Sequence, residues 1–301
     1  MKKFIQKITI FIFLIIVVDY FSGLGFSFLQ ERAPFGNWKR FRYINDEMKD
    51  EVLIMGSSRA SHHYVPQIIE DSLGISCYNC GVDGNGIVMF WGNFQMFIER
   101  YAPKMIIYDL SIFDVISDDY TTYLGWLKAY YDRACVKSIF DDIDPLEKYK
   151  MCSSLYKWNF KFIQLMTDNI AQFVKTDKGY KPLSGMMNYS PGKDKNIITD
   201  DSQIYKCDDL KMCYFERMIS ICNQKRIKLV FALSPMYGAS SSKNYEKVLL
   251  LARKYKCPII DCFADSRFVN NYKYFKDSSH MNSDGAQEYT KYLVGIISSI
   301  F

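Results

Sequence analysis

The fold of this chain is decided by one stretch near its beginning, Val52-Leu-Ile-Met-Gly-Ser-Ser-Arg59. Its four consecutive apolar residues predict a strand buried on both faces, which is typical of a parallel sheet covered by helices. The glycine and the two serines that follow predict a tight turn from this strand into a helix. A side chain on such a turn lies at the carboxyl edge of the sheet, where open α/β folds bind their ligands.

The same alternation of short apolar runs and helical stretches continues along most of the chain. The further predicted strands are Ile75–Tyr78, Lys104–Leu110, Lys228–Leu233 and Cys257–Asp261. The predicted helices are Ala60–Leu73, Gly86–Tyr101, Asp208–Gln224, Asn244–Tyr255 and Asp284–Ile300. Strands that alternate with helices in this way predict an α/β fold with five parallel strands between two helical layers.

The alternation stops between the third and fourth strands, where residues 116–203 are rich in Tyr, Lys and Asp. Within this insertion, apolar residues recur at a spacing that predicts an amphipathic helix: Leu155, Trp158, Phe162 and Leu165. Long insertions on such sheets often form lids or substrate walls. A helical annex that serves only packing is the alternative, and the residues alone do not separate the two.

The chain begins with a basic segment followed by an apolar run from Ile8 to Val18. Counted from Phe4 to Leu29, the apolar segment is long enough to span a bilayer as a helix. This pattern predicts an uncleaved signal anchor, with a cleaved signal peptide and a buried helix of a soluble protein as the alternatives. Because lysines precede the run, we expect the N-terminus in the cytoplasm and the rest of the chain in the periplasm or at the cell surface.

These features divide the chain into three predicted parts. Residues 1–29 are the signal anchor, and residues 30–50 are a juxtamembrane connector that contains Pro34 and Gly36. Residues 51–301 form the α/β domain, which carries the insertion at about 116–203. We therefore expect one folded domain outside the membrane.

The composition excludes several classes of protein. A hydrophobic fraction of 49% allows a packed core and excludes global disorder. The net charge of +5 comes from scattered basic residues, so we expect no nucleic-acid binding. The nine cysteines are an odd number, and the Cys77-x-x-Cys80 pair lacks the second pair that a zinc site needs. We therefore expect neither a disulfide framework nor a bound metal.

The side chains needed for nucleophilic catalysis occur at the two ends of the α/β pattern. Ser58 follows the first strand, and His280, one of only three histidines, precedes the last helix. A serine hydroxyl becomes a nucleophile when a base takes its proton, and histidine suits that role. Asp277 stands three residues before His280, where its carboxylate could hold the imidazole in one tautomer.

Three sequence blocks resemble those of the SGNH/GDSL hydrolase superfamily. In chain order they are Gly56-Ser-Ser58, Asn79-Cys-Gly-Val-Asp-Gly84 and Asp277-Ser-Ser-His280. The resemblance implies a flavodoxin-like three-layer α/β/α sandwich in which Ser58 is the nucleophile, His280 the general base and Asp277 its orienting group. It also implies an oxyanion hole made by the backbone N–H groups of Ser58 and Gly84, and it calls for no cofactor.

Two positions depart from the superfamily pattern. The aspartate that usually precedes the nucleophile is Ser57 here. The third block, Gly-x-Asn-Asp, falls on Ser111-Ile-Phe-Asp114, so Phe113 replaces an asparagine that donates to the oxyanion. Loss of one such donor costs about 10²–10³ in rate. With its predicted anchor, the chain is similar to the branch that includes the D-alanyl-lipoteichoic acid transfer protein and related polysaccharide acyl-modifying proteins.

Four more residues near these blocks could bind substrate or could be structural. Arg59 could bind an anionic substrate or pair with a local acid, and Asp114 could face the site or cap a helix. His62 and His63 lie one turn into the helix after Ser58, and we expect packing or solvent-facing roles for both.

From the residues and the resemblance together we expect a membrane-anchored, extracytoplasmic serine esterase or O-acyltransferase. Its expected substrate is acylated cell-surface glycan, and other envelope proteins are candidate partners. The alternative is a catalytically inactive SGNH-fold envelope protein that binds glycan or assists assembly, and Phe113 favours that alternative.

Overall fold

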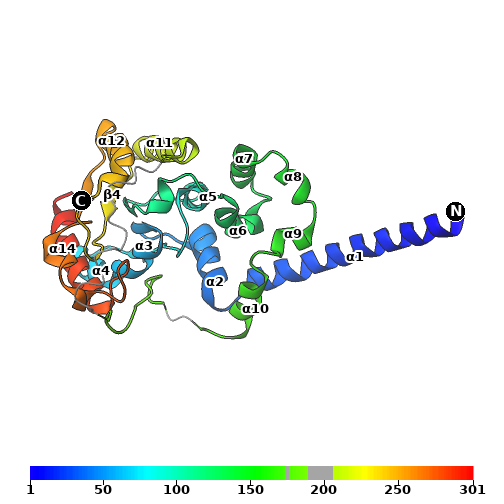
Figure 1. Ribbon diagram of the computed structural model, residues 1–301, viewed down its shortest axis with the longest axis horizontal. Helices are drawn as coiled ribbons and strands as arrows, with labels where there is room; N and C mark the ends of the chain where they lie inside the picture. Colours follow the sequence, from blue (N-terminus) through cyan, green and yellow to red (C-terminus); the bar gives the residue numbers. More distant parts are fainter. Residues whose placement is uncertain (174–175, 189–205, 301) are drawn as a thin grey trace. The chain divides into compact units, whose positions relative to one another are not determined.

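The computed structural model describes residues 1–173, 176–188 and 206–300 (Figure 1). The chain forms two compact units, and each is described by itself. One consists of Met1–Glu47 with Tyr120–Val174, and the other of Met48–Asp119 with Lys175–Phe301. The last part of the predicted insertion, residues 189–203, lies outside the described residues.

The second unit contains the predicted five-stranded parallel sheet. Its strands are β1 (Val52–Gly56), β2 (Cys77–Asn79), β3 (Met105–Asp109), β4 (Lys228–Leu233) and β5 (Ile259–Asp261). They are arranged in the order β2-β1-β3-β4-β5, and every neighbouring pair is parallel. The α/β fold class predicted from the apolar runs is therefore confirmed.

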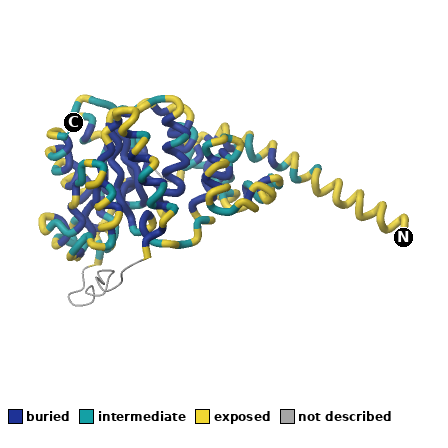
Figure 2. Tube along the Cα trace, turned by 90° about the horizontal axis from the view of Figure 1, so that it is seen from above, coloured by how far each residue is buried: buried dark blue, intermediate teal, exposed yellow. Residues whose placement is uncertain are grey.

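Helices cover the two faces of this sheet. They are α3 (Ser58–His63), α4 (Pro66–Leu73), α5 (Ile87–Ile98), η2 (Ile112–Asp114), α11 (Asp209–Gln224), η5 (Lys243–Tyr245), α12 (Glu246–Lys254), α13 (Ser266–Val269), η6 (Tyr272–Tyr274) and α14 (Ser283–Ile300). Every residue of β1 and β3 is buried, as their apolar sequences require, and Figure 2 shows buried backbone at the centre of this unit.

Alternate residues of each strand point into two separate layers. Ile54 and Ile107 belong to one apolar cluster with Leu293 of α14. On the other face, the ring of Tyr108 packs against Phe90 of α5 and Phe215 of α11, with ring centroids 5.9 and 5.2 Å apart. Both faces are thus covered, and the free carboxyl edge of the sheet is left for the loops that carry the site.

The helix predicted over residues 60–73 is two helices in the structure, α3 and α4. Pro66 lacks a backbone N–H, and the residue before a proline avoids the helical conformation. Val65 accordingly has φ −99° and ψ 103°, in the extended region. The break ends α3 at His63, so the two histidines after Ser58 lie in a single short helix beneath the site.

The first unit is helical throughout its described residues. Its elements are α1 (Lys2–Arg32), α2 (Gly36–Arg42), η1 (Tyr43–Glu47), α6 (Thr121–Leu127), η3 (Lys128–Tyr130), α7 (Ala134–Ile143), α8 (Glu147–Lys150), α9 (Ser154–Trp158) and α10 (Phe162–Ile170). The residues predicted as a connector, 30–50, therefore contain α2 and η1. Trp38 of α2 is buried because it packs against Trp126 and Trp158, with ring centroids 5.1 and 5.6 Å away.

Within the described part of the chain, α1 is the one helix long and apolar enough to cross a membrane. Helices of this kind near an N-terminus are found both in signal anchors and in signal peptides. Inside the unit, the Asp19 carboxylate accepts the N–H groups of Ser154 and Leu155 at 2.7 and 2.8 Å, so α1 caps the start of α9.

Candidate active site

The turn after β1 sets the position of Ser58. Gly56 has φ +136°, a conformation that favours glycine, and a Cβ there would lie 2.4 Å from the carbonyl oxygen of Asp109. The chain can therefore turn sharply against β3 and enter α3, whose first residue is Ser58. The close approach of the Asp109 carbonyl oxygen therefore requires a glycine at position 56.

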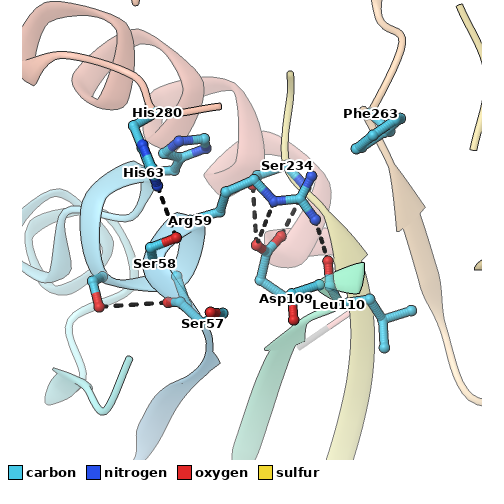
Figure 3. Close-up of polar contacts among 12 residues, drawn as sticks. Ser57, Ser58, Arg59, His63, Asp109, Leu110, Ser234, Phe263 and His280 are labelled. Atoms are coloured by element: carbon cyan, nitrogen blue, oxygen red, sulfur yellow. Dashed lines mark hydrogen bonds and ion pairs between the residues drawn. The ribbon is translucent and has the colours of Figure 1, made fainter. Parts of the chain in front are cut away.

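Ser58, His280 and Asp277 form a continuous hydrogen-bonded chain. The His280 Nε2 atom lies 2.8 Å from the Ser58 Oγ atom (Figure 3). The His280 Nδ1 atom lies 2.9 and 3.0 Å from the two carboxylate oxygens of Asp277. Because a carboxylate can only accept, Nδ1 carries the proton, and the lone pair of Nε2 faces the serine hydroxyl. These three predicted residues are brought together.

Asp277 is held in place by its own turn. Its Oδ1 atom accepts the backbone N–H groups of Ser279 and His280, both at 2.9 Å. Partial burial alone would raise the pKa of the Asp277 carboxyl, but the His280 ring and these N–H groups outweigh burial and lower that pKa below its usual value. Asp277 is therefore ionised at neutral pH, in the state that can orient and stabilise an imidazolium.

Gly84 lies in the turn after β2, with φ +66°. The loop before it packs tightly on α3, since a Cβ at Gly81 would lie 2.5 Å from the Ser61 nitrogen. The Asn79 side chain also joins the two segments by donating to the Ala60 and Tyr64 carbonyls at 2.7 and 3.1 Å. This packing places Gly84 among the residues that line the same cavity as Ser58.

Arg59 is buried and paired with an acid. Its Nε atom lies 3.6 Å from Asp109, the last residue of β3, and its guanidinium also donates to the Leu110 carbonyl (Figure 3). Burial would lower the pKa of Arg59, but the oxygens of Tyr245 and Asp109 outweigh burial and raise it. Of the two roles considered for Arg59, this geometry corresponds to pairing with a local acid, although the residue also lines the cavity.

Asp114 is fully buried and satisfied inside the protein. Its carboxylate accepts the Ser111 N–H at 2.7 Å, the Ser111 hydroxyl at 2.9 Å and the Tyr108 hydroxyl at 2.8 Å. Asp114 had been considered as a helix N-cap. In the structure Ser111 is the N-cap of η2, and Asp114, at the third helical position, completes the capping box with it. Burial raises the pKa of Asp114 to about 6. These hydrogen bonds hold the loop that carries Phe113 in one conformation.

The same loop is fastened by Lys211, which the sequence analysis did not single out. The ammonium group of this buried lysine donates to the Phe113 and Ile116 carbonyls at 2.7 and 2.8 Å and lies 2.6 Å from Asp118. A lone lysine in a helical pattern gives no signal of such a role. Phe113 itself is 37% exposed and lines the cavity, so an apolar side chain lies at this part of the cavity wall.

His62 and His63 are both buried, and both contact the site. The His62 Nδ1 atom donates to the Lys181 carbonyl at 2.7 Å, and its ring centroid lies 5.4 Å from that of His280. The His63 Nε2 atom accepts the N–H of Met281 at 2.9 Å, directly after His280. Burial lowers the pKa of both histidines. Packing roles were expected for this pair, and these contacts also help to position His280.

The cavity above the carboxyl edge has a volume of about 560 Å³. Ser58, Gly84 and His280 line one part of it, and apolar side chains including Met236, Tyr245 and Phe263 line another. Among the described residues, no group of three or more His, Cys, Asp or Glu side chains could hold a metal ion, and all nine cysteines are free thiols. The groups gathered here suit acyl transfer through a serine.

No protein-family model matches the sequence, and no curated protein matches it either. Solved structures with a similar fold include a G-D-S-L family protein from Desulfitobacterium hafniense DCB-2, at 12% identity and a TM-score of 0.42, which covers 81% of this chain and 98% of that one. Another is a GDSL-like lipase from Bacteroides thetaiotaomicron, at 11% identity and a TM-score of 0.43, which covers 87% of this chain and 98% of that one. At identities this low, the likeness concerns the fold alone.

Proposed function

We propose that this protein is a serine esterase or O-acyltransferase in which Ser58, His280 and Asp277 form the catalytic triad. The single observation that carries the proposal is the 2.8 Å contact between the Ser58 Oγ atom and the His280 Nε2 atom, with Nδ1 of the same ring held by Asp277. A serine and a histidine 222 positions apart meet with the tautomer that proton abstraction requires. Packing alone gives no reason for this alignment.

In the proposed reaction, the Ser58 oxygen attacks the ester carbonyl carbon while its proton passes to His280 Nε2. The negative charge that develops on the carbonyl oxygen is held by the backbone N–H groups of Ser58 and Gly84. The tetrahedral intermediate collapses as Nε2 returns the proton to the leaving alkoxide, which leaves an acyl group on Ser58. Water or a sugar hydroxyl then attacks this acyl-enzyme by the reverse path, with His280 again taking the proton.

The expected setting of this reaction is the outer side of a membrane. The length and apolar character of α1 support a signal anchor, and the lysines before it support an N-terminus on the cytoplasmic side. We propose acylated cell-surface glycan as the substrate. Whether water or a sugar hydroxyl accepts the acyl group depends on which of them reaches Ser58 first.

The proposal is tested by labelling the full-length, detergent-solubilised protein with a fluorophosphonate probe. We expect wild type and Ser72→Ala to be labelled, since Ser72 is an exposed serine of α4, whereas Ser58→Ala should not react. Labelling that survives in Ser58→Ala, or wild-type protein that never reacts while its circular dichroism shows a folded chain, would overturn the proposal.

One observation favours a second candidate function. Phe113 lines the cavity at the position of the missing donor, so the oxyanion would be held by two N–H groups only. A catalytically inactive protein with this cavity would bind acylated glycan or assist envelope assembly. In that case the folded protein would bind such a glycan with unchanged affinity when Ser58 is replaced by alanine, and no product would form.

A further inference from the structure

We propose that the substrate's acyl group is an uncharged apolar chain of several methylene groups, which lies along the cavity from Ser58 toward β5. This inference rests on the proposed function and adds the chemical class of the group that is transferred. Three observations support the inference. They are the order of the strands whose ends line the cavity, the apolar side chains of the loops after these strands, and the charged residues that line the same cavity.

The cavity extends across most of the sheet edge. Ser58 follows β1, Ile112 follows β3, Met236 follows β4 and Phe263 follows β5, and all four residues line it. From β1 to β5 the sheet order crosses three strand spacings, which amount to about 14 Å. Figure 3 draws Arg59 between the Ser58–His280 pair and Phe263. An acetyl group bonded to Ser58 would leave most of this length empty.

Beyond Ser58 the cavity is lined by apolar and polar side chains, and the polar ones include Arg59, Ser241 and Asn244. Met236, Tyr245 and Phe263 are each less than a tenth exposed, and the Tyr245 and Phe263 rings pack edge to face with centroids 5.3 Å apart. The Met236 N–H donates to the Phe263 carbonyl at 3.1 Å, so the loops after β4 and β5 are joined at this point. Burial of methylene groups against these three apolar side chains would stabilise a bound acyl chain.

The charges in the cavity argue against an aminoacyl group. The Arg59 guanidinium, 5.0 Å from the centre of the Phe263 ring, is already paired with Asp109, so an ammonium group would find no free counter-charge in this part of the cavity. Asp83, an acid that also lines the cavity, is already paired with Lys181 at 3.0 Å. An anionic acyl chain is disfavoured too, because Asp109 matches the charge of Arg59. A neutral chain requires none of these pairs to break.

The test is a series of 4-nitrophenyl esters (acetate, butyrate, hexanoate and octanoate), with the D-alanyl ester and the hemisuccinate as charged members. Rates are measured with the full-length protein in detergent, and the rate of Ser58→Ala is subtracted. We expect kcat/KM to rise by about two- to fourfold for each added methylene until the cavity is filled. Ile112→Trp should flatten this rise, whereas Leu250→Trp, which adds the same ring to an exposed position on α12, should leave it unchanged.

The outcomes separate this inference from the function on which it rests. A chain-length dependence that disappears in Ile112→Trp supports both. If Ser58 is labelled by the fluorophosphonate but the acetate or the D-alanyl ester is the best substrate, the apolar acyl group is wrong and the triad stands. If neither labelling nor Ser58-dependent hydrolysis occurs, the proposed function fails, and this inference fails with it.

Discussion

Replacement of Asp277 by asparagine gives a measure of what the carboxylate contributes to the proposed triad. The substitution keeps the shape of the side chain and removes its charge. Asp277 Oδ1 accepts two backbone N–H groups at 2.9 Å, so the asparagine oxygen should stay there. The new NH₂ group would then replace Oδ2, which lies 3.0 Å from His280 Nδ1. The imidazolium that forms during reaction would lose its counter-charge.

The size of the effect follows from distance and exposure. Opposite charges about 4 Å apart attract by about 1 kcal/mol in water and about 4 kcal/mol at an effective dielectric constant of about 20. The Asp277 side chain is 53% exposed, so we take the lower half of this range, about 1–2.5 kcal/mol. The expected fall in kcat is therefore about 5- to 70-fold, well below the roughly 10⁴-fold loss seen where a triad aspartate is buried.

The assay is hydrolysis of a 4-nitrophenyl ester at pH 7, followed under saturating substrate for the full-length protein. Asp71→Asn, the same change at an exposed position of α4, serves as the matched control and should match wild type. A kcat for Asp277→Asn within twofold of wild type would show that the carboxylate does not assist the reaction. A loss above 10³-fold would show that the solvent screening assumed here is wrong.

The remaining predictions concern the loop that carries Phe113. Phe113→Asn introduces an amide donor at the cavity wall. We expect kcat to rise by at least tenfold, toward the rate enhancement of about 10²–10³ that one such donor can supply. An unchanged kcat would mean that the new side chain does not reach the oxyanion. Lys211→Met leaves two carbonyl groups and Asp118 without the buried ammonium group that they contact. We therefore expect the free energy of unfolding to fall by about 3 kcal/mol. The fall is measured as a lower urea midpoint, and Ser72→Ala serves as the control that should not change it. Burial raises the pKa of Asp114 to about 6, so the folded state binds this proton more tightly than the unfolded chain does. The contribution of Asp114 to the free energy of unfolding therefore falls by about 3 kcal/mol as the pH rises from about 4 to 6. The difference between urea midpoints at pH 4 and pH 7 should shrink in Asp114→Asn, and an unchanged difference would contradict this assignment.

Much of the sheet could be predicted because its signals are local. The run from Val52 to Met55 is apolar over consecutive residues, as a strand buried on both faces must be, and β3 and β4 carry similar runs. The triad residues could be proposed because Ser58 follows a strand end and because Asp277 and His280 are three residues apart. Such patterns give residue types and their order along the chain, but no distances between them.

What could not be predicted depends on contacts between distant segments. Arg59 meets Asp109 because β1 and β3 pair with Gly56 opposite Asp109, a register that no local pattern contains. Trp38 lies in a stretch that reads as a connector, and its aromatic partners follow about a hundred residues later. The helix break at Pro66 is a different case, since the proline was visible in the sequence and its steric effect on Val65 is general.

The separation of 222 positions between Ser58 and His280 has a consequence for biosynthesis. A ribosome delivers the Ser58 hydroxyl first and the His280 imidazole only 222 residues later. Until then, the nascent chain holds a serine hydroxyl without the base that the proposed triad needs to activate it. Premature termination before His280 would likewise yield a fragment that lacks the proposed base.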